Sequence, residues 1–190
     1  ALLDKRENKV FFSRDRFGEK PLYYSLWNGT LYFGSEIKFL SELSGIKPSI
    51  NYDQISRYLV NGYKSLYKKP STFYSDIMEL PPASYAFIDS PKKLDPKQYF
   101  KISFSPSEMK LSDVVEGARE HIVRSLSSRL RSDVPLAFCL SGGVDSTALA
   151  SVASKKLGHE LHAFTIIDSD ERYNETKNVL NTVNHLECHH

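Results

Sequence analysis

Residues 134–147 read VPLAFCLSGGVDST, and this stretch decides the fold of the part of the chain around it. Residues 136–140 form an unbroken apolar run without alternation, which predicts a parallel strand buried on both faces. Small residues follow at 141–146, and residues 147–156 then favour a helix that ends at Gly158. Free backbone N–H groups and the positive end of the helix dipole meet in such a loop, so the stretch predicts a phosphate-binding site.

The residue types of the loop distinguish between several kinds of phosphate loop. A Walker loop needs Lys followed by Ser or Thr after its last glycine, where this chain has Val144 and Asp145. The dinucleotide pattern G-x-G-x-x-G also fails, because Gly142 and Gly143 are adjacent and no third glycine follows at the required spacing. The sequence Ser-Gly-Gly-x-Asp-Ser at 141–146 instead resembles the pyrophosphate loop of the ATP pyrophosphatases, which cleave ATP between its α and β phosphates.

This resemblance implies a role for each residue of the loop. The residues implied to hold the pyrophosphate end of ATP are Ser141, Gly142, Gly143, Val144 and Ser146. Asp145 is implied to lie near the Mg²⁺ ion of the nucleotide, and Leu140 and Ile166 to contact the nucleoside. Two plainer interpretations stay open: the loop is an ordinary strand-to-helix turn, and Leu140 is a core residue only.

Composition limits the class of protein. The chain has 190 residues, of which 41% are hydrophobic and 25% charged, as in a soluble globular protein with one large or two small domains. A net charge of +2 gives no reason to expect a nucleic-acid surface, and no apolar run is long enough for a membrane span. Cys139 and Cys188 suggest neither a disulfide framework nor a metal site, which favours the cytoplasm. Because the chain does not begin with Met, we expect it to be a fragment of a longer protein.

The first hundred residues predict short antiparallel strands and helices. Asn28-Gly29 lies between two segments rich in aromatic and other strand-favouring residues, 23–27 and 30–33, which predicts a hairpin. Ser35 is expected to cap a short helix that begins at Glu36. The remaining expected elements are a strand at 10–12, a helix at 52–60 with Asn51 as its cap and Gln54 in a near capping box, strands at 72–80 and 83–88 around a Pro-Pro turn, and a last short strand at 98–104.

Three motifs in this region carry a second resemblance. RDRFGEKPLYY at 14–24, FGSEIKFL at 33–40 and LPP at 80–82 resemble the later half of the glutaminase domain of the glutamine-hydrolysing asparagine synthetases. That domain is a class II amidotransferase with an α+β, Ntn-hydrolase-like fold of antiparallel sheets between helices. The family's Cys nucleophile and glutamine-binding residues lie upstream of these motifs, so no catalytic residue is assigned in this chain. Arg14 and Asp15 are interpreted as a structural ion pair at a strand end, with catalysis as the alternative.

A break at Ser105-Pro106-Ser107 predicts two domains, 1–104 as the C-terminal half of the glutaminase domain and 105–190 as the N-terminal half of the synthetase domain. Apolar residues spaced three and four apart between 111 and 130 predict a long amphipathic helix. A second strand at 161–167 and a helix opening at 173 complete an α/β pattern with a doubly wound parallel sheet, of the ATP pyrophosphatase (adenine nucleotide alpha hydrolase-like) type. Residues 141–146 and 167–171 are then expected to face one crevice at the carboxyl ends of the strands.

Three other features have a functional and a plain interpretation. His162 could act as a ligand or an acid–base group, but a single His in a strand is more often packed or exposed. Residues 188–190, Cys-His-His, could bind a metal, but three contiguous residues do not easily surround a tetrahedral ion, and they fit the start of a third strand. The lysines of 64–69 could contact nucleic acid, but a solvated loop is the preferred interpretation.

The resemblance implies a glutamine-hydrolysing asparagine synthetase. Such an enzyme uses ATP and Mg²⁺ to activate the aspartate carboxylate as an acyl-adenylate with release of pyrophosphate, and ammonia from glutamine then forms asparagine. We expect a cytoplasmic protein that can form a homodimer and that binds neither nucleic acid nor membrane. The alternatives are a related amidotransferase acting on another carboxylate, such as a sugar uronate, and a non-catalytic nucleotide-binding protein.

Overall fold

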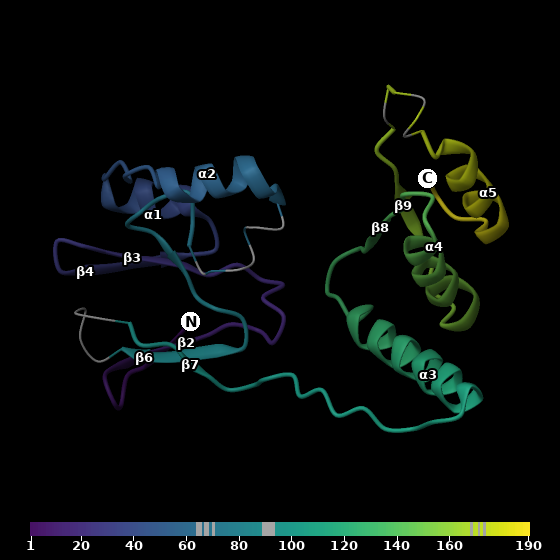
Figure 1. Cartoon of the computed structure of the whole chain (residues 1–190), viewed down its shortest axis with the longest axis horizontal. Coiled ribbons are helices and arrows are strands. Elements are labelled where there is room, and N and C mark those ends of the chain that lie inside the picture. Colours follow the sequence, from purple (N-terminus) through teal and green to yellow (C-terminus); the bar gives the residue numbers. More distant parts are fainter. Residues whose placement is uncertain are drawn as a thin grey trace. The chain divides into compact units, whose positions relative to one another are not determined.

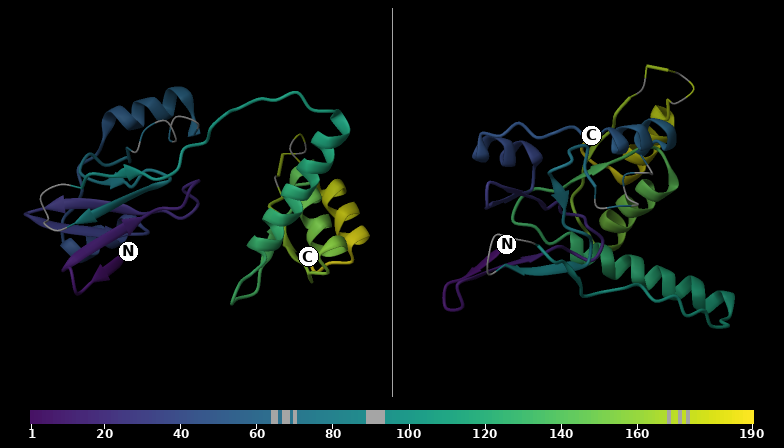
Figure 2. Two further views of the ribbon diagram at one scale, coloured as in Figure 1. Left: turned by 90° about the horizontal axis from the view of Figure 1, so that it is seen from below. Right: turned by 60° about the vertical axis from the view of Figure 1, so that its left-hand side comes forward.

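The computed structural model divides the chain into two compact units, Ala1–Ser105 and Pro106–His190. In Figures 1 and 2 the first unit runs from purple to teal and the second from teal-green to yellow. The structure describes residues 1–63, 66, 69, 71–88, 94–167, 169, 170, 172 and 174–190. Within these residues no helix has both the length and the hydropathy needed to cross a membrane.

The first unit contains two antiparallel sheets. One sheet has the order β1-β2-β6-β7, and its strands are Leu2–Asp4, Lys9–Ser13, Ser84–Ile88 and Lys97–Gln98. The other has the order β4-β3-β5, with strands Thr30–Gly34, Tyr23–Trp27 and Met78–Glu79. The predicted hairpin between β3 and β4 is confirmed: Trp27 pairs with Thr30, and both residues of the Asn28-Gly29 turn have positive φ.

The two sheets pack face to face and helices cover the second sheet. Phe12 and Ala86 from one sheet share a core with the partly buried Tyr24 of the other and with Leu80, which directly follows β5. Helix α1 (Ile37–Ser44) buries Leu40 against Trp27 of β3, and Figure 1 shows α1 and α2 (Tyr52–Asn61) on the far side of the β3–β4 hairpin from β2, β6 and β7. This mixture of helices and antiparallel sheets confirms the α+β class for this unit.

Several predicted elements of the first unit differ from the structure. Helix α1 starts after Glu36, which is extended, so Ser35 lies one residue too early to cap it. Residues 72–77 form no regular strand. The hydroxyl of Thr72 bonds the carbonyl oxygens of Tyr74 and Ile77, so these backbone acceptors are less available for hydrogen bonds to a neighbouring strand. The predicted strand at 98–104 ends at Gln98, since Tyr99 already pairs with Ala83, just before β6 begins. Strand β1 was not predicted at all.

The second unit begins with α3 (Leu111–Arg129) and then alternates strand and helix. Strand β8 (Ala137–Cys139) leads into α4 (Val144–Ser151), which continues as the π-helical segment η2 (Val152–Lys156). Strand β9 (His162–Phe164) precedes α5 (Thr176–Leu186) and pairs with β8 in parallel, with Cys139 opposite Phe164. His189 forms a parallel bridge with His162, so the chain starts a third strand after α5, as the sequence predicted.

The sheet of this unit is covered on one face. Phe138 and Ala163 pack into a core that includes Leu126 of α3, Ala150 of α4 and Val179 of α5. The prediction of a strand buried on both faces was wrong for the described residues, because the alternate side chains of the two strands, Ala137, Cys139, His162 and Phe164, are exposed. The apolar stripe of α3 is also largely open, with only Leu126 buried.

Candidate functional site

The predicted phosphate loop lies between β8 and α4. Gly142 has a φ of +81°, which lets the chain turn sharply, and Gly143 is the N-cap of α4. Val144, Asp145 and Ser146 therefore form the first helical turn, which corrects the prediction that the helix starts at residue 147. The first turn of an α-helix has N–H groups without intrahelical partners, so the structure presents a row of donors at this point.

Serine hydroxyls occupy part of the loop's hydrogen-bonding capacity. Ser146 Oγ accepts the N–H of Ser141 at 3.3 Å and donates to the carbonyl oxygen of Gly143 at 3.2 Å. Ser141 Oγ accepts the N–H of Gly143 at 3.3 Å and lies 3.1 Å from Ser146 Oγ. All four of these contacts are long for hydrogen bonds of their type, so the loop's donors are held weakly and can turn toward a phosphate oxygen.

Gly142 lies close against the start of α5. A Cβ atom at this position would lie 2.8 Å from the Cβ of Glu175 and 3.1 Å from its carbonyl oxygen. The glycine is thus required both for the backbone conformation and for space. The loop and α5 meet at this point, which the sequence did not show.

The strand ends beside the loop are tied together through Thr165. Leu140 donates its N–H to Phe164, and its carbonyl oxygen accepts the Thr165 hydroxyl at 2.9 Å. Thr165 Oγ1 also lies 2.9 Å from His190 Nε2. The Thr165 hydroxyl takes the place of a backbone N–H as the donor to Leu140. Strand β9 therefore ends at Phe164, earlier than the predicted end at residue 167. Neither Thr165 nor His190 was among the predicted site residues, although the rule that parallel strands end at one edge points to both.

The two predicted nucleoside contacts have different surroundings. The Leu140 side chain is buried in the core of the unit, which agrees with its plainer interpretation. Ile166 is 98% exposed and follows β9 directly, so its side chain is open to a ligand. Of the predicted acidic loop at 168–171, Asp168 and Glu171 lie outside the described residues, and Asp170 is paired with Arg172 at 2.6 Å.

Asp145 stands alone as a candidate metal ligand. It is exposed in the first turn of α4, and no group of three or more His, Cys, Asp or Glu in the described part of the chain could hold a metal ion. Mg²⁺ is commonly held by one or two carboxylates together with phosphate oxygens and water, so a single Asp beside a phosphate loop fits that ion better than a metal enclosed by protein ligands.

A shallow pocket of about 380 Å³ adjoins the loop. The loop and α4 form one side of it, and α5 contributes polar side chains to the other. Those α5 residues are Asn178, Asn181 and Thr182, and Thr182 Oγ1 lies 3.5 Å from Thr147 Oγ1 of α4. The sequence did not single them out, because their relation to the loop depends on the packing of α5.

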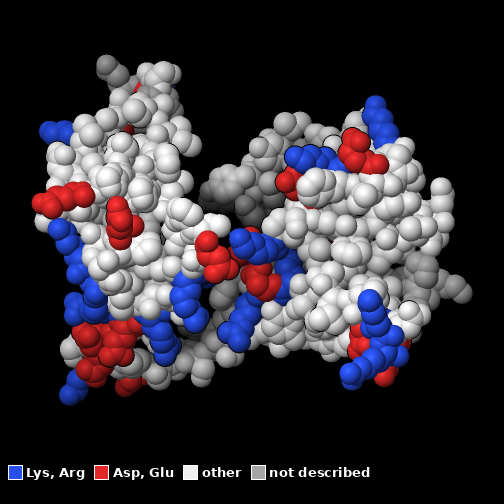
Figure 3. All heavy atoms as spheres, turned by 180° about the vertical axis from the view of Figure 1, so that it is seen from behind, with Lys and Arg blue, Asp and Glu red and all other residues white. Residues whose placement is uncertain are grey.

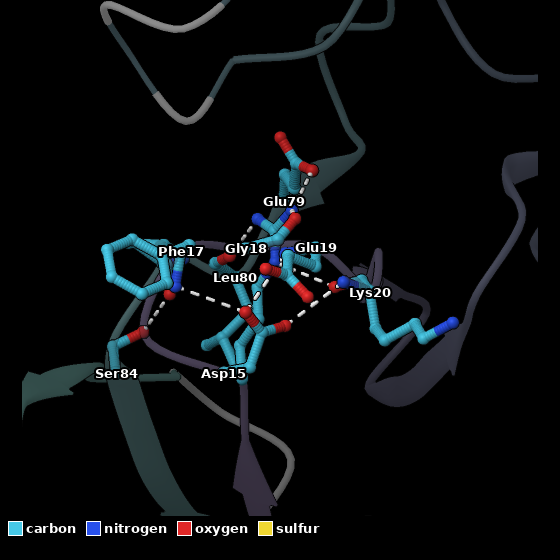
Figure 4. A network of polar contacts seen from close by, with 10 residues as sticks. Asp15, Phe17, Gly18, Glu19, Lys20, Glu79, Leu80 and Ser84 are labelled. Carbon is cyan, nitrogen blue, oxygen red and sulfur yellow. Dashed lines mark hydrogen bonds and ion pairs between the residues drawn. The ribbon is translucent and has the colours of Figure 1, made fainter. Parts of the chain in front are cut away.

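Arg14 is structural in the first unit. Its side chain is 8% exposed and donates to the carbonyl oxygens of Lys20, Leu80 and Gly18 at 2.9, 2.7 and 2.8 Å. Its ion-pair partner is Glu79, at 2.8 Å, and not the adjacent aspartate as predicted. Figure 4 shows Glu79 and Leu80 meeting the turn at 15–20 from a segment distant in sequence.

The Asp15 carboxylate organises the same turn. It accepts the backbone N–H groups of Phe17, Glu19 and Lys20 at 3.0–3.1 Å, as Figure 4 shows. These bonds, that from Lys20 most strongly, hold the pKa of Asp15 below its ordinary value of 3.8. The carboxylate is therefore a turn-forming group, in agreement with the structural interpretation.

We expect Asp15→Asn to destabilise the first unit at pH 7 by about 1 kcal/mol or less, because solvent weakens these charge-assisted bonds. The folded pKa lies below the unfolded one, so the stabilisation is complete above the unfolded pKa and is lost as pH falls through the folded pKa. Urea denaturation followed by the fluorescence of Trp27 should show the difference from wild type shrinking from pH 7 to pH 3. The exposed Asp95→Asn serves as control, and a difference that stays constant in acid would contradict this account.

The other candidate sites have little supporting geometry. His162 is exposed, and its ring stacks on that of His189 at 5.0 Å. His189 also approaches Glu160 at 3.3 Å. Within 64–69, only Leu66 and Lys69 are among the described residues. On the face shown in Figure 3, the described Lys and Arg side chains are interspersed with Asp and Glu.

Comparison with known proteins gives matches along both units. Residues 1–100 match the family model described as "Glutamine amidotransferase domain", and residues 117–190 match that described as "Asparagine synthase". The chain is 33% identical to asparagine synthetase [glutamine-hydrolyzing] 2 of Bacillus subtilis over 92% of its own length and 24% of that protein. It is 32% identical to asparagine synthetase 1 of the same organism over 90% of the chain and 26% of that protein, and 30% identical to a putative asparagine synthetase of Methanocaldococcus jannaschii over 100% and 37%. The chain thus spans about a quarter to over a third of the length of these relatives.

Proposed function

Because the chain belongs to the family of the glutamine-hydrolysing asparagine synthetases, we propose that it is part of an ATP-dependent ligase that forms an amide with ammonia from glutamine. In this proposal 1–104 is the later half of an Ntn-hydrolase-like glutaminase domain. Residues 105–190 are the first half of a synthetase domain of the ATP pyrophosphatase type. The observation that carries the proposal is the Ser-Gly-Gly-Val-Asp-Ser sequence at a strand end and a helix N-terminus.

The loop residues bind the pyrophosphate end of ATP. The N–H groups at the start of α4, with the hydroxyls of Ser141 and Ser146, are donors for phosphate oxygens, and Gly142 and Gly143 allow those oxygens to approach the backbone. When the α–β phosphate bond breaks, negative charge builds on the departing pyrophosphate. Donors that are already oriented toward this charge stabilise the transition state with little reorganisation.

Three further residues complete the proposed nucleotide site. Asp145 would hold Mg²⁺ together with phosphate oxygens, and the ion supplies charge neutralisation to the leaving group. Ile166 is the better placed of the two nucleoside contacts, because its side chain is exposed whereas that of Leu140 is in the core. We add Asn178 to the proposed site, since it lines the pocket beside Gly142 and Gly143.

The reaction that we propose has two steps in the synthetase domain. A carboxylate oxygen of aspartate attacks the α phosphorus, the bond to the β phosphate breaks, and pyrophosphate leaves. Ammonia then attacks the acyl carbon, a proton is lost, and AMP leaves with the electrons of the broken bond, which gives asparagine. Hydrolysis of glutamine to glutamate supplies the ammonia. A cytoplasmic homodimer is part of the proposal, and the free thiols of Cys139 and Cys188 agree with a reducing compartment.

The test is an assay of pyrophosphate release by the full-length protein with glutamine, ATP, Mg²⁺ and aspartate. We expect release that requires aspartate, and we expect Asp145→Asn to lower it at least tenfold because the metal loses its protein ligand. Asp133→Asn, an exposed aspartate of the same unit, is the matched control and should keep the wild-type rate.

The other outcomes of this assay distinguish the alternatives. Pyrophosphate release that does not require aspartate, but is stimulated by another acid such as a sugar uronate, would mean that this acid is the acceptor. The proposed reaction would otherwise be unchanged. The absence of release with every acid tested would favour a nucleotide-binding protein without catalysis. Equal rates for Asp145→Asn and Asp133→Asn would show that Asp145 is not a ligand of the metal.

A further inference from the structure

The first unit contains a cavity of about 540 Å³. Its lining combines apolar walls with a small number of polar and charged side chains from several elements. Those used in the argument below are Arg14, Gln54, Lys69, Thr72, Phe73 and Glu79. A cavity of this size and mixed lining is typical of a small-molecule site.

Two of the buried polar groups in this lining are used mainly to hold the fold together. Arg14 donates through all three guanidinium nitrogens to carbonyl oxygens and to Glu79. Thr72 Oγ1 bonds the carbonyl oxygens of Tyr74 and Ile77 and accepts the N–H of Tyr74. Arg14 thus uses four of its five N–H donors and Thr72 its only hydroxyl hydrogen within the protein, so we treat both as parts of the wall.

Gln54 differs from them. Its side chain is 2% exposed in the first turn of α2, and its Nε2 atom has no hydrogen-bond partner among the residues that the structure describes. The amide orientation is fixed, because Oε1 accepts Arg57 Nη1 at 2.9 Å. The other end of the amide is therefore an NH₂ group with two unused donors in a buried place, which is unfavourable unless an acceptor joins it.

The charges of the lining indicate which acceptor this is. Lys69 supplies a cation that forms no ion pair with the described residues. One oxygen of the Glu79 carboxylate, Oε1, pairs with Arg14, and within the described part of the chain the other oxygen has no ion-pair partner. A carboxylate would satisfy Gln54 Nε2 and the lysine, and an ammonium group would satisfy Glu79. We propose that this cavity binds a free α-amino acid, with its carboxylate on Gln54 Nε2 and its side chain against the apolar wall at Phe73.

Calorimetric titration of the full-length protein with each of the twenty L-amino acids tests the proposal. We expect at least one amino acid other than glutamine and aspartate, the substrates of the proposed function, to bind at one site per chain. Gln54→Met should weaken that binding at least tenfold, since methionine keeps the volume and lacks the donors. Gln98→Met, at an exposed glutamine of the same unit, should bind as wild type does. Lys69→Met should weaken binding more than Lys47→Met, which changes an exposed lysine that does not line the cavity.

The proposed function already requires glutamine and aspartate to bind elsewhere in the full-length protein. Only binding of the other amino acids that Gln54→Met removes and Asp145→Asn leaves unchanged is therefore assigned to the cavity. Gln54→Glu is a second variant that keeps the acceptor for Arg57 and replaces the donors with an acceptor, and Trp27 fluorescence shows whether each variant is folded. Equal binding in wild type and both Gln54 variants would overturn the proposal. So would the absence of binding for all amino acids other than glutamine and aspartate, or a crystal structure in which Gln54 Nε2 donates to another residue of the protein.

Discussion

Gly142→Ala is expected to lower pyrophosphate release by the full-length protein at least a hundredfold. The φ of +81° already disfavours an L-residue, by about 1–2 kcal/mol. In addition, the new methyl group would lie 2.8 Å from the Cβ of Glu175 and 3.1 Å from its carbonyl oxygen, which is backbone and cannot rotate away. The loop must therefore move away from α5, and a displacement of about 1 Å at a site that positions reacting groups costs on the order of 100-fold in rate.

The second unit offers a control for the conformational part of this effect. Gly158 has a φ of +66°, but a Cβ there would meet nothing within 4 Å. Gly158→Ala should therefore destabilise the unit by about 1 kcal/mol and leave the rate within a few-fold of wild type. If the two variants lost activity equally, the contact with Glu175 would be irrelevant. If Gly142→Ala were fully active, the loop would not hold the pyrophosphate in the way that we propose.

The phosphate loop shows what a single sequence can predict. The run at 136–140 and the small residues after it placed a strand, a sharp turn and a helix in the right order, because each depends on local chemistry. The exact start of α4 was wrong by three residues, since Val144, Asp145 and Ser146 are compatible with both a loop and a first helical turn. The open face of β8 was also not predicted, because burial depends on which elements pack against a strand.

Contacts across long stretches of sequence could not be predicted. The close approach of Gly142 to Glu175 and the hydrogen bond from Thr165 to Leu140 depend on how α5 and β9 pack. No local sequence pattern predicts that packing. The same holds for Arg14. Its structural role was predicted correctly, but its ion-pair partner was not. A neighbouring aspartate was the natural expectation, yet Asp15 is occupied by backbone N–H groups and Glu79 arrives from a distant strand.

Arg14→Met is expected to destabilise the first unit by about 3 kcal/mol, the typical cost of removing one partner of a buried ion pair. The variant leaves the carbonyl oxygens of Lys20, Leu80 and Gly18 without their donor, and leaves Glu79 without its counter-charge. Methionine has a similar length, so the loss comes from polar contacts more than from a cavity. Arg14→Lys should restore little of it, because an ammonium group cannot reproduce the planar fork that reaches these oxygens together.

Trp27 makes this measurement specific to the first unit, because it is the only tryptophan of the chain and lies in that unit's core. Urea denaturation followed by its fluorescence should give a much lower midpoint for Arg14→Met than for wild type. Arg16→Met is the matched control: its side chain is exposed and lies 5.0 Å from the Phe100 ring, a contact worth about 0.5–1 kcal/mol. Equal midpoints for the two variants would mean that Glu79 and the three carbonyl oxygens find other partners, and that the turn at 15–20 does not depend on Arg14.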